Sequence, residues 1–367
     1  MKLHYILGLA LLASCSSNKE AQTEETKTTD RLVNTLQWAV DNGKYIYGHA
    51  DDTAYGRFWE YEPGRSDVKE TVGDYPGLIN WDLGWIELDS LENLDGVPFE
   101  YMRKEIVNQD ARGGINSISW HLRNPVTGGD AWDTSDTTAV AQIVTPGTPA
   151  NELMLGWIGK TADFIGSLKD AEGNLIPVMY RPWHEHSGSW FWWGAKLCTP
   201  EQYKELWNMT RKVFDEKGIE NVLWVYSPDK IYSEEEYLER YPGDDMIDVM
   251  GIDIYHFDNE DGIETYRNNI KTGLGIADKV AKEHGKILAL TETGLEGLPI
   301  DDWYTRILMP AIDQYPVAFV CVWRNAQVNL KPEQFYAPYP GHPSAADFKL
   351  FYESPKTLFV RDLQTEN

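Results

Sequence analysis

The sequence predicts a single-domain α/β protein of the (β/α)8 TIM-barrel class. Short apolar runs rich in β-branched residues alternate with longer amphipathic stretches from residue 30 onward, and we count eight such runs. This alternation is typical of strand–helix units around a parallel sheet. No linker or change of composition divides residues 30–367. Since a barrel of this kind often fills about 250 residues as one unit, we expect residues 30–367 to form one domain.

The predicted elements follow in order along the chain. The eight strands are residues 45–50, 77–82, 115–121, 176–185, 222–228, 248–256, 287–294 and 317–325. Residues 199–218 predict a helix that opens with a capping box of Thr199 and Gln202 and ends on Gly218. Residues 122–150 form a long loop rich in Gly, Thr, Asp and Pro, and a loop of this length in a compact domain is usually functional.

The N-terminus has the features of an export signal. Residues 1–17, MKLHYILGLALLASCSS, combine a basic start, an apolar run and a small-residue site. The ending LASC resembles a bacterial lipobox, so we expect residues 1–14 to be removed and Cys15 to be lipidated, and the alternative is an ordinary cleaved signal peptide. Residues 15–29 are polar and predict a flexible tether. We expect a bacterial envelope protein anchored through Cys15, with the periplasmic side favoured because no acidic run follows this cysteine.

The charge and the cysteines restrict the partners. With 33 basic and 58 acidic residues, the chain has a formal charge of −25 and a pI near 4.6. This charge repels the phosphates of nucleic acids and anionic lipids, so we expect no nucleic-acid partner and membrane contact only through the lipid on Cys15. A monomer is the default expectation. Cys198 and Cys321 could form a disulfide in an oxidising compartment, but Cys321 lies in an apolar run that equally favours a buried thiol.

Polar and aromatic residues gather at the predicted strand ends, where the active sites of such barrels form. They are His49, Asp51, Asp52, Asp82, Trp85, His121, His184, Glu185, Tyr226, Asp253, Tyr255, His256, Glu292, Trp323 and Arg324. Carboxylates and imidazoles are rarely buried without a partner or a purpose. A ring of them therefore indicates a functional site.

The sequence lacks the motifs of several other kinds of functional site. HEH at 184–186 does not have the His-Glu-x-x-His spacing of zinc proteases, and GHADD at 48–52 lacks the alternating oxygen ligands of a calcium loop. GLG at 273–275 lies in a helical stretch, so it is no nucleotide-binding fingerprint. No Gly-x-Ser-x-Gly elbow of a serine hydrolase occurs. We therefore expect neither a metal nor a cofactor.

What remains is a pair of carboxylates, Glu185 and Glu292, on the fourth and seventh predicted strands. These strands lie nearly opposite each other across an eight-stranded barrel. Glycoside hydrolysis needs such a pair, because one carboxylic acid protonates the leaving oxygen while the other attacks the anomeric carbon or activates water. A separation of about 5–5.5 Å would mean retention of configuration, and a wider gap inversion.

Three motifs resemble glycoside hydrolase family 26, whose members are chiefly β-mannanases. They are RPWHEHSGSWFWWG at 181–194, GIDIYH at 251–256 and TETG at 291–294. The resemblance covers nearly all of residues 30–360 and implies a retaining (β/α)8 enzyme with Glu185 as acid/base and Glu292 as nucleophile. It also implies a set of residues that bind substrate or support the site. They are His121, His184, Trp190, Tyr255, Trp323, Arg181, Asp253 and Arg324.

The physical roles agree with the resemblance. Flanking tryptophans would desolvate Glu185 and raise its pKa, whereas Arg181 and the Tyr255 hydroxyl could keep Glu292 ionised. Some of these candidate site residues could have a structural role instead. His121 and His184 could be structural histidines, and Arg324 could form a salt bridge beneath the site. Trp192 and Trp193 are expected in the core, and Trp132 is a weaker candidate for sugar contact.

The sequence thus predicts an enzyme that hydrolyses β-1,4-mannosidic bonds in mannan, galactomannan or glucomannan and releases manno-oligosaccharides. A related β-xylanase or mixed-linkage β-glucanase is the alternative within the enzyme class, because a few loop contacts decide the substrate. A non-catalytic surface glycan-binding lipoprotein is the alternative outside it. Whether cleavage is internal or directed to a chain end depends on loops such as 122–150 and 256–264.

Overall fold

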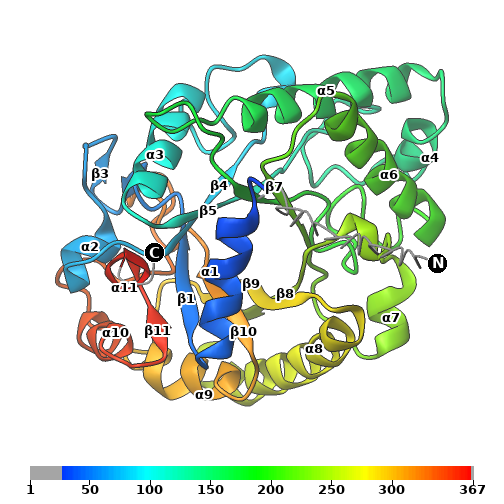
Figure 1. Cartoon of the computed structure of the whole chain (residues 1–367). Helices are drawn as coiled ribbons and strands as arrows, with labels where there is room; N and C mark the ends of the chain where they lie inside the picture. The colour runs from blue at the N-terminus through cyan, green and yellow to red at the C-terminus, as the bar shows by residue number, and fades with distance from the viewer. Residues whose placement is uncertain (1–26, 365–367) are drawn as a thin grey trace, which may run out of the picture.

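The computed structural model describes residues 27–364 and shows a closed parallel barrel ringed by helices (Figure 1). The barrel strands are β1 (Tyr45–Ala50), β4 (Leu78–Asp82), β5 (Ile115–Ser119), β6 (Val178–Arg181), β7 (Val222–Tyr226), β8 (Val249–His256), β9 (Ile287–Leu295) and β10 (Val317–Val322). Each strand pairs in parallel with its successor, and β10 pairs with β1 to close the barrel. The eight predicted strands and the single-domain barrel are confirmed. The predicted signal peptide and Cys15 lie outside the described residues.

Helices fill most of the connections between these strands. They are α1 (Asp30–Asp41), α2 (Asp67–Val72), α3 (Phe99–Ala111), α4 (Ala139–Ile143), α5 (Pro149–Gly166), α6 (Pro200–Glu216), α7 (Glu234–Glu239), α8 (Ile263–His284), α9 (Met309–Ile312), α10 (Ala345–Tyr352) and α11 (Val360–Gln364). Thr199 caps α6 in the predicted capping box with Gln202. The Gly-Leu-Gly stretch at 273–275 lies inside α8, as predicted.

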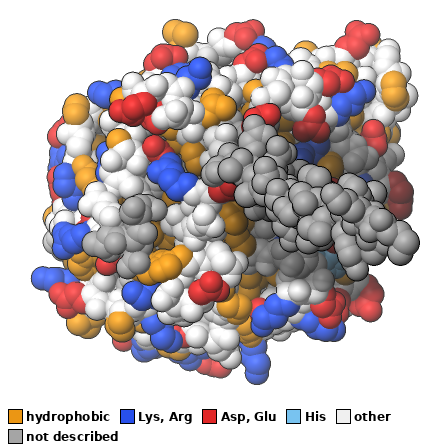
Figure 2. All heavy atoms as spheres, viewed as in Figure 1, with side chains coloured by type: hydrophobic (Ala, Val, Ile, Leu, Met, Phe, Trp, Pro, Cys, Tyr) orange, Lys and Arg blue, Asp and Glu red, His pale blue; other side chains and the backbone are white. Residues whose placement is uncertain are grey.

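The N-terminal end of the barrel is closed by α1, which crosses the front of the strands in Figure 1. Its buried residues Leu32, Leu36 and Ala39 pack in one cluster with side chains from the starts of the strands, among them Ile46 and Leu78. Figure 2 shows acidic and basic side chains interspersed around this face. Since α1 occupies this end, a substrate must reach the barrel from the opposite, C-terminal end of the strands.

The predicted ends of several strands were wrong. The fourth, third and eighth strands end earlier than predicted, so Glu185, His121 and Trp323 lie in the turns that follow them. Left-handed backbone at Trp183 (φ 55°) and Glu185 (φ 54°) ends the strand pairing after Arg181. The long loop 122–150 contains the short helix α4.

Two pairings were not predicted at all. An antiparallel hairpin of β2 (Tyr55–Gly56) and β3 (Trp59–Glu60) follows β1. The two-residue strand β11 (Thr357–Leu358) pairs with the start of β1.

The described part of the chain also shows the state of the two cysteines and the apolar character of its helices. Cys198 and Cys321 are both buried and are free thiols. Among residues 27–364 no helix is long and apolar enough to cross a membrane.

Candidate active site

A cavity of about 320 Å³ opens at the C-terminal ends of the strands. It brings together most of the residues that the sequence singled out. They are His121, Trp132, Glu185, Trp190, Tyr255, Glu292, Trp323 and Arg324. Arg181, His184 and Asp253 do not line this cavity, and the contacts below place them behind its wall as supports.

Glu292 is held by two hydrogen bonds on opposite sides of its carboxylate. It lies on β9 and is almost fully buried. The Tyr255 hydroxyl donates to Oε1 at 2.5 Å, and the Arg181 guanidinium donates to Oε2. Both donors favour the charged carboxylate. The sequence-based expectation of these two partners is confirmed by the geometry.

Arg181 connects Glu292 to a second buried carboxylate. Its Nη1 donates to Asp253 Oδ2 at 2.5 Å, and Asp253 Oδ1 accepts from the Thr291 hydroxyl at 2.6 Å. Burial opposes the charge of Arg181, but the carboxylates of Asp253 and Glu292 outweigh it and raise its pKa. Arg181 is therefore a permanent cation behind the cavity, and its fork fixes the orientation of both carboxylates.

Glu185 has the opposite surroundings. It lies in the turn after β6, where its N–H donates to the Ser227 carbonyl at 2.8 Å, and its Oε2 accepts from the Trp190 indole at 2.6 Å. Burial raises the pKa of Glu185 well above its usual range, and the charges of Glu292, Asp253 and Asp229 raise it further. This carboxyl group is therefore suited to carry a proton near neutral pH.

The tryptophans near Glu185 divide into cavity walls and core. Trp190 is 39% exposed and Trp132 is 48% exposed, whereas Trp192 and Trp193 are fully buried, as expected for packing residues. The Trp132 ring stacks on His121 with centroids 5.4 Å apart and planes 12° apart. Trp132, the weaker candidate from the sequence, thus lines the cavity together with Trp190. Exposed aromatic faces at a cleft suit contact with sugar rings.

His121 and His184 form a hydrogen-bonded chain that starts at Asp82. His121 Nδ1 lies 2.6 Å from Asp82 Oδ2, and its Nε2 lies 3.1 Å from His184 Nε2. Burial alone would lower the pKa of His121, but Asp82 raises it overall. Burial, together with the charges of Arg181 and His121, lowers the pKa of His184 well below its usual range. His121 thus lies between Asp82 and His184, and of the two histidines only His121 lines the cavity.

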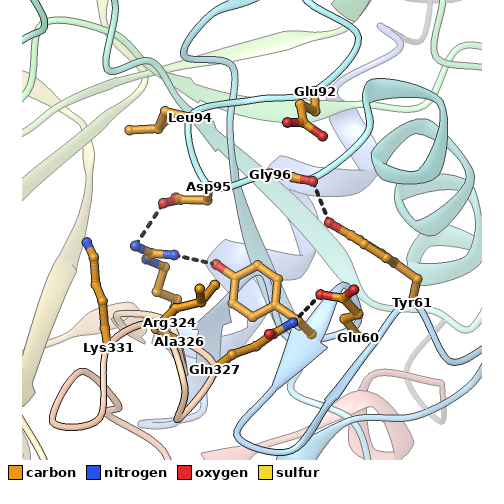
Figure 3. A pocket seen from close by; sticks show the side chains of 12 residues that line it. Glu60, Tyr61, Glu92, Leu94, Asp95, Gly96, Arg324, Ala326, Gln327 and Lys331 are labelled. Carbon is orange, nitrogen blue, oxygen red and sulfur yellow. Dashed lines mark hydrogen bonds and ion pairs between the residues drawn. The ribbon is translucent and has the colours of Figure 1, made fainter.

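Arg324 links this cavity to a second one of about 390 Å³ (Figure 3). Its guanidinium donates to the Tyr55 hydroxyl at 3.0 Å and to Gln334 Oε1 at 3.0 Å, and it pairs with Asp95 at 2.8 Å. Arg324 thus forms the salt bridge that the sequence allowed and also lines both cavities. Asp95, Gln334 and Lys331 line the first cavity as well, and sequence reasoning missed them because they lie in loops without a motif.

Four other strand-end residues form hydrogen bonds within the protein. His49 Nδ1 lies 2.7 Å from Asp52 Oδ1, and Asp51 accepts from the Tyr55 hydroxyl at 2.6 Å. Tyr226 is fully buried and lies 2.9 Å from His186 Nε2. Within residues 27–364 no three His, Cys, Asp or Glu side chains are grouped so that they could hold a metal ion.

Known proteins resemble this chain over most of its length. A solved GH26 β-mannanase from Bacteroides ovatus is 51% identical, with a TM-score of 0.88 over 92% of this chain and 96% of that one. The catalytic domain of an endo-β-1,4-mannanase from Bacillus sp. JAMB-750 is 30% identical, with a TM-score of 0.83 over 92% of both chains. A mannan endo-1,4-β-mannosidase from Bifidobacterium adolescentis is 32% identical over 94% of this chain, which spans 35% of that protein's length. Residues 21–293 match the family model itself, and the chain therefore belongs to glycosyl hydrolase family 26.

Proposed function

We propose that the protein is a β-mannanase that hydrolyses β-1,4-mannosidic bonds, as the names of its relatives indicate for them. One observation carries the proposal. Two carboxyl groups at one cavity have opposite surroundings: Glu185 is desolvated among like charges, and Glu292 is held by Arg181 and Tyr255. Such a division of one residue type into a proton donor and an anion is what glycoside hydrolysis requires.

The proposed mechanism is a double displacement with retention. The Glu292 carboxylate attacks the anomeric carbon, the bond from this carbon to the leaving oxygen breaks, and Glu185 gives its proton to that oxygen. Glu185 then takes a proton from water, whose oxygen attacks the same carbon and releases Glu292. Arg181 and Tyr255 orient Glu292 throughout, while Trp190 holds Glu185 in place. The residues act without a cofactor in this scheme.

The experiment that tests the proposal is a time course of products from linear mannan, galactomannan, xylan and mixed-linkage β-glucan. We expect short manno-oligosaccharides from mannan, and losses of about 10³-fold or more in kcat for Glu185→Ala and Glu292→Ala, as for other catalytic groups. Glu62→Ala, an exposed carboxylate outside the cavity, serves as the control. Cleavage of xylan or β-glucan instead of mannan would show that the enzyme has a different substrate from the one proposed. Binding of these glycans without cleavage would show a glycan-binding protein.

We also propose, from the sequence, that the mature protein is a monomer anchored by a lipid on Cys15 at the periplasmic side of the bacterial envelope. The support is the Leu-Ala-Ser-Cys ending of the export signal and the polar residues that follow it. Mass spectrometry of the N-terminal peptide should find a diacylated cysteine, and Cys15→Ala should release the protein from the membrane fraction. An unmodified N-terminus at another cleavage site would show an ordinary signal peptide instead.

A further inference from the structure

The two cavities at the strand ends join into one cleft. They share Leu94, Asp95, Arg324 and Lys331, so the space beside the catalytic carboxylates continues past Arg324 towards Tyr61 (Figure 3). At its far end the second cavity is bounded by Glu60 and Gln327. A third hollow of about 350 Å³, lined by Phe58 among others, lies beyond them and shares both of these residues. Glu60 and Gln327 therefore separate the cleft from the next hollow.

The separation is a direct side-chain contact between distant parts of the chain. The Gln327 amide donates to the Glu60 carboxylate across the end of the cavity (Figure 3). Glu60 ends the hairpin strand β3, and Gln327 lies in the loop after β10. We name this hydrogen-bonded pair the Glu60–Gln327 ridge. Nearby, the Tyr61 hydroxyl donates to the Gly96 carbonyl, so the hairpin is also tied to the loop after β4.

The backbone beneath the ridge is fastened independently of it. Arg57 donates to the carbonyl of Ala326 and, at 2.6 Å, to that of Pro332, and its guanidinium lies 4.5 Å from the Phe335 ring centroid. The Val328 N–H donates back to the Arg57 carbonyl at 3.1 Å. These contacts hold the hairpin against the loop after β10. The ridge side chains, exposed Glu60 and half-buried Gln327, can therefore be removed without releasing either segment.

We propose that the Glu60–Gln327 ridge determines how many sugar units the cleft accepts on one side of the scissile bond. The inference rests on the proposed function. The ridge joins segments that follow the neighbouring strands β1 and β10, and Glu292 lies on β9, next to β10. Glu185, which must face the leaving oxygen, follows β6 on the other side of the barrel and does not line the second cavity. The ridge therefore lies on the side of the units that stay on Glu292, which is the non-reducing side of the substrate. A longer chain on that side meets the ridge instead of continuing past Phe58.

The test compares cleavage positions in manno-oligosaccharides labelled at the reducing end. In Glu60→Ala and Gln327→Ala we expect the main cleavage to move towards the reducing end by one or more sugar units, because more units fit on the other side. The products from linear mannan should lengthen accordingly. Glu60→Gln keeps a hydrogen-bonding partner for Gln327 and should retain the wild-type pattern. Melting temperatures close to that of the wild type establish that each variant is folded.

Two matched variants separate the ridge from other effects. Glu92→Ala removes a carboxylate from the same cavity and leaves the ridge intact, and Glu62→Ala removes one from the same segment outside both hollows. Wild-type cleavage positions in folded Glu60→Ala and Gln327→Ala would overturn the inference and leave the proposed function standing. An equal shift in Glu92→Ala would assign the effect to charge and also overturn it. A wild type that cleaves no manno-oligosaccharide would overturn the proposed function, and the inference with it.

Discussion

The protonation of Glu185 depends in part on a carboxylate that does not line the cavity. Asp229 is half-buried in the loop after β7, and its charge raises the pKa of Glu185. In Asp229→Asn the like charge is absent, so the pKa of Glu185 falls. Since kcat/KM requires protonated Glu185, its alkaline limb should move to lower pH, while the acidic limb stays closer to its place. A pH profile of kcat/KM measures both limbs. An alkaline limb that does not move would assign that limb to another group.

Arg181 should matter for stability as much as for activity. It pairs with Asp253 and Glu292 in the interior, so Arg181→Met leaves two buried carboxylates without their cation. Removing one partner of a buried ion pair costs about 3–5 kcal/mol, and a misplaced Glu292 should lower kcat/KM by about 100-fold or more. Arg181→Lys keeps the charge but loses the forked guanidinium. Its stability and its kcat/KM should therefore lie between those of the wild type and Arg181→Met. Urea unfolding and initial rates measure these effects, and a stable, active Arg181→Met would contradict the assigned role.

Sequence reasoning found residues that a motif marks and missed those that only the fold brings together. The motif at 181–194 identified Glu185 and Trp190, and the expected partners of Glu292 were correct. No sequence signal identified Asp95 or Lys331, because each lies in an irregular loop and reaches the cavity only through tertiary packing. The left-handed backbone that aims Glu185 was missed as well. A glutamate rarely adopts a left-handed backbone conformation, so nothing in the sequence indicated one at this position.

At the scale of single elements, the turn after β8 is built around a glycine. A Cβ on Gly262 would lie 1.6 Å from the Phe257 carbonyl oxygen. Asp258 and Asn259 have left-handed backbone, and the turn is anchored where His256 Nε2 lies 2.8 Å from the Asn259 carbonyl. The turn therefore closes only because residue 262 has no side chain.

Gly262→Ala should consequently destabilise the protein by about 1–3 kcal/mol, the usual cost of inserting a group into a packed site. Activity should fall too, because Tyr255, which donates to Glu292, directly precedes this turn. Gly156→Ala is the matched control: it lies exposed in α5 with no atom near its added Cβ and should stabilise by roughly 0.5–1 kcal/mol. Denaturant unfolding of both variants gives the comparison. Equal stabilities for the two would show that the turn can open at little cost.

For the whole molecule, the barrel was predictable because its strands are apolar runs that persist along the chain. The short strands added to the barrel were not predictable, because β2, β3 and β11 each contain only two residues. A two-residue strand has no periodicity to read. Its pairing depends on segments that are distant in sequence, such as β11 with β1. The ridge that ends the cleft belongs to this unpredictable part.

The two ends of the barrel have different roles: the N-terminal end holds a packed core with α1, and the C-terminal end holds the cavity. A substitution in α1 tests whether the two ends are independent. Leu36 of α1 is fully buried against the starts of the strands, on the opposite side of the barrel from Glu185 and Glu292. Leu36→Ala should cost about 2–5 kcal/mol in the free energy of unfolding, with kcat/KM unchanged in the folded protein, because the strand ends keep their positions. Asn34→Ala, on the exposed face of the same helix, should change neither quantity. Urea unfolding and initial rates on mannan, measured well below the melting temperature, decide the matter: a large loss of kcat/KM in Leu36→Ala would mean that the two ends are coupled through the strands.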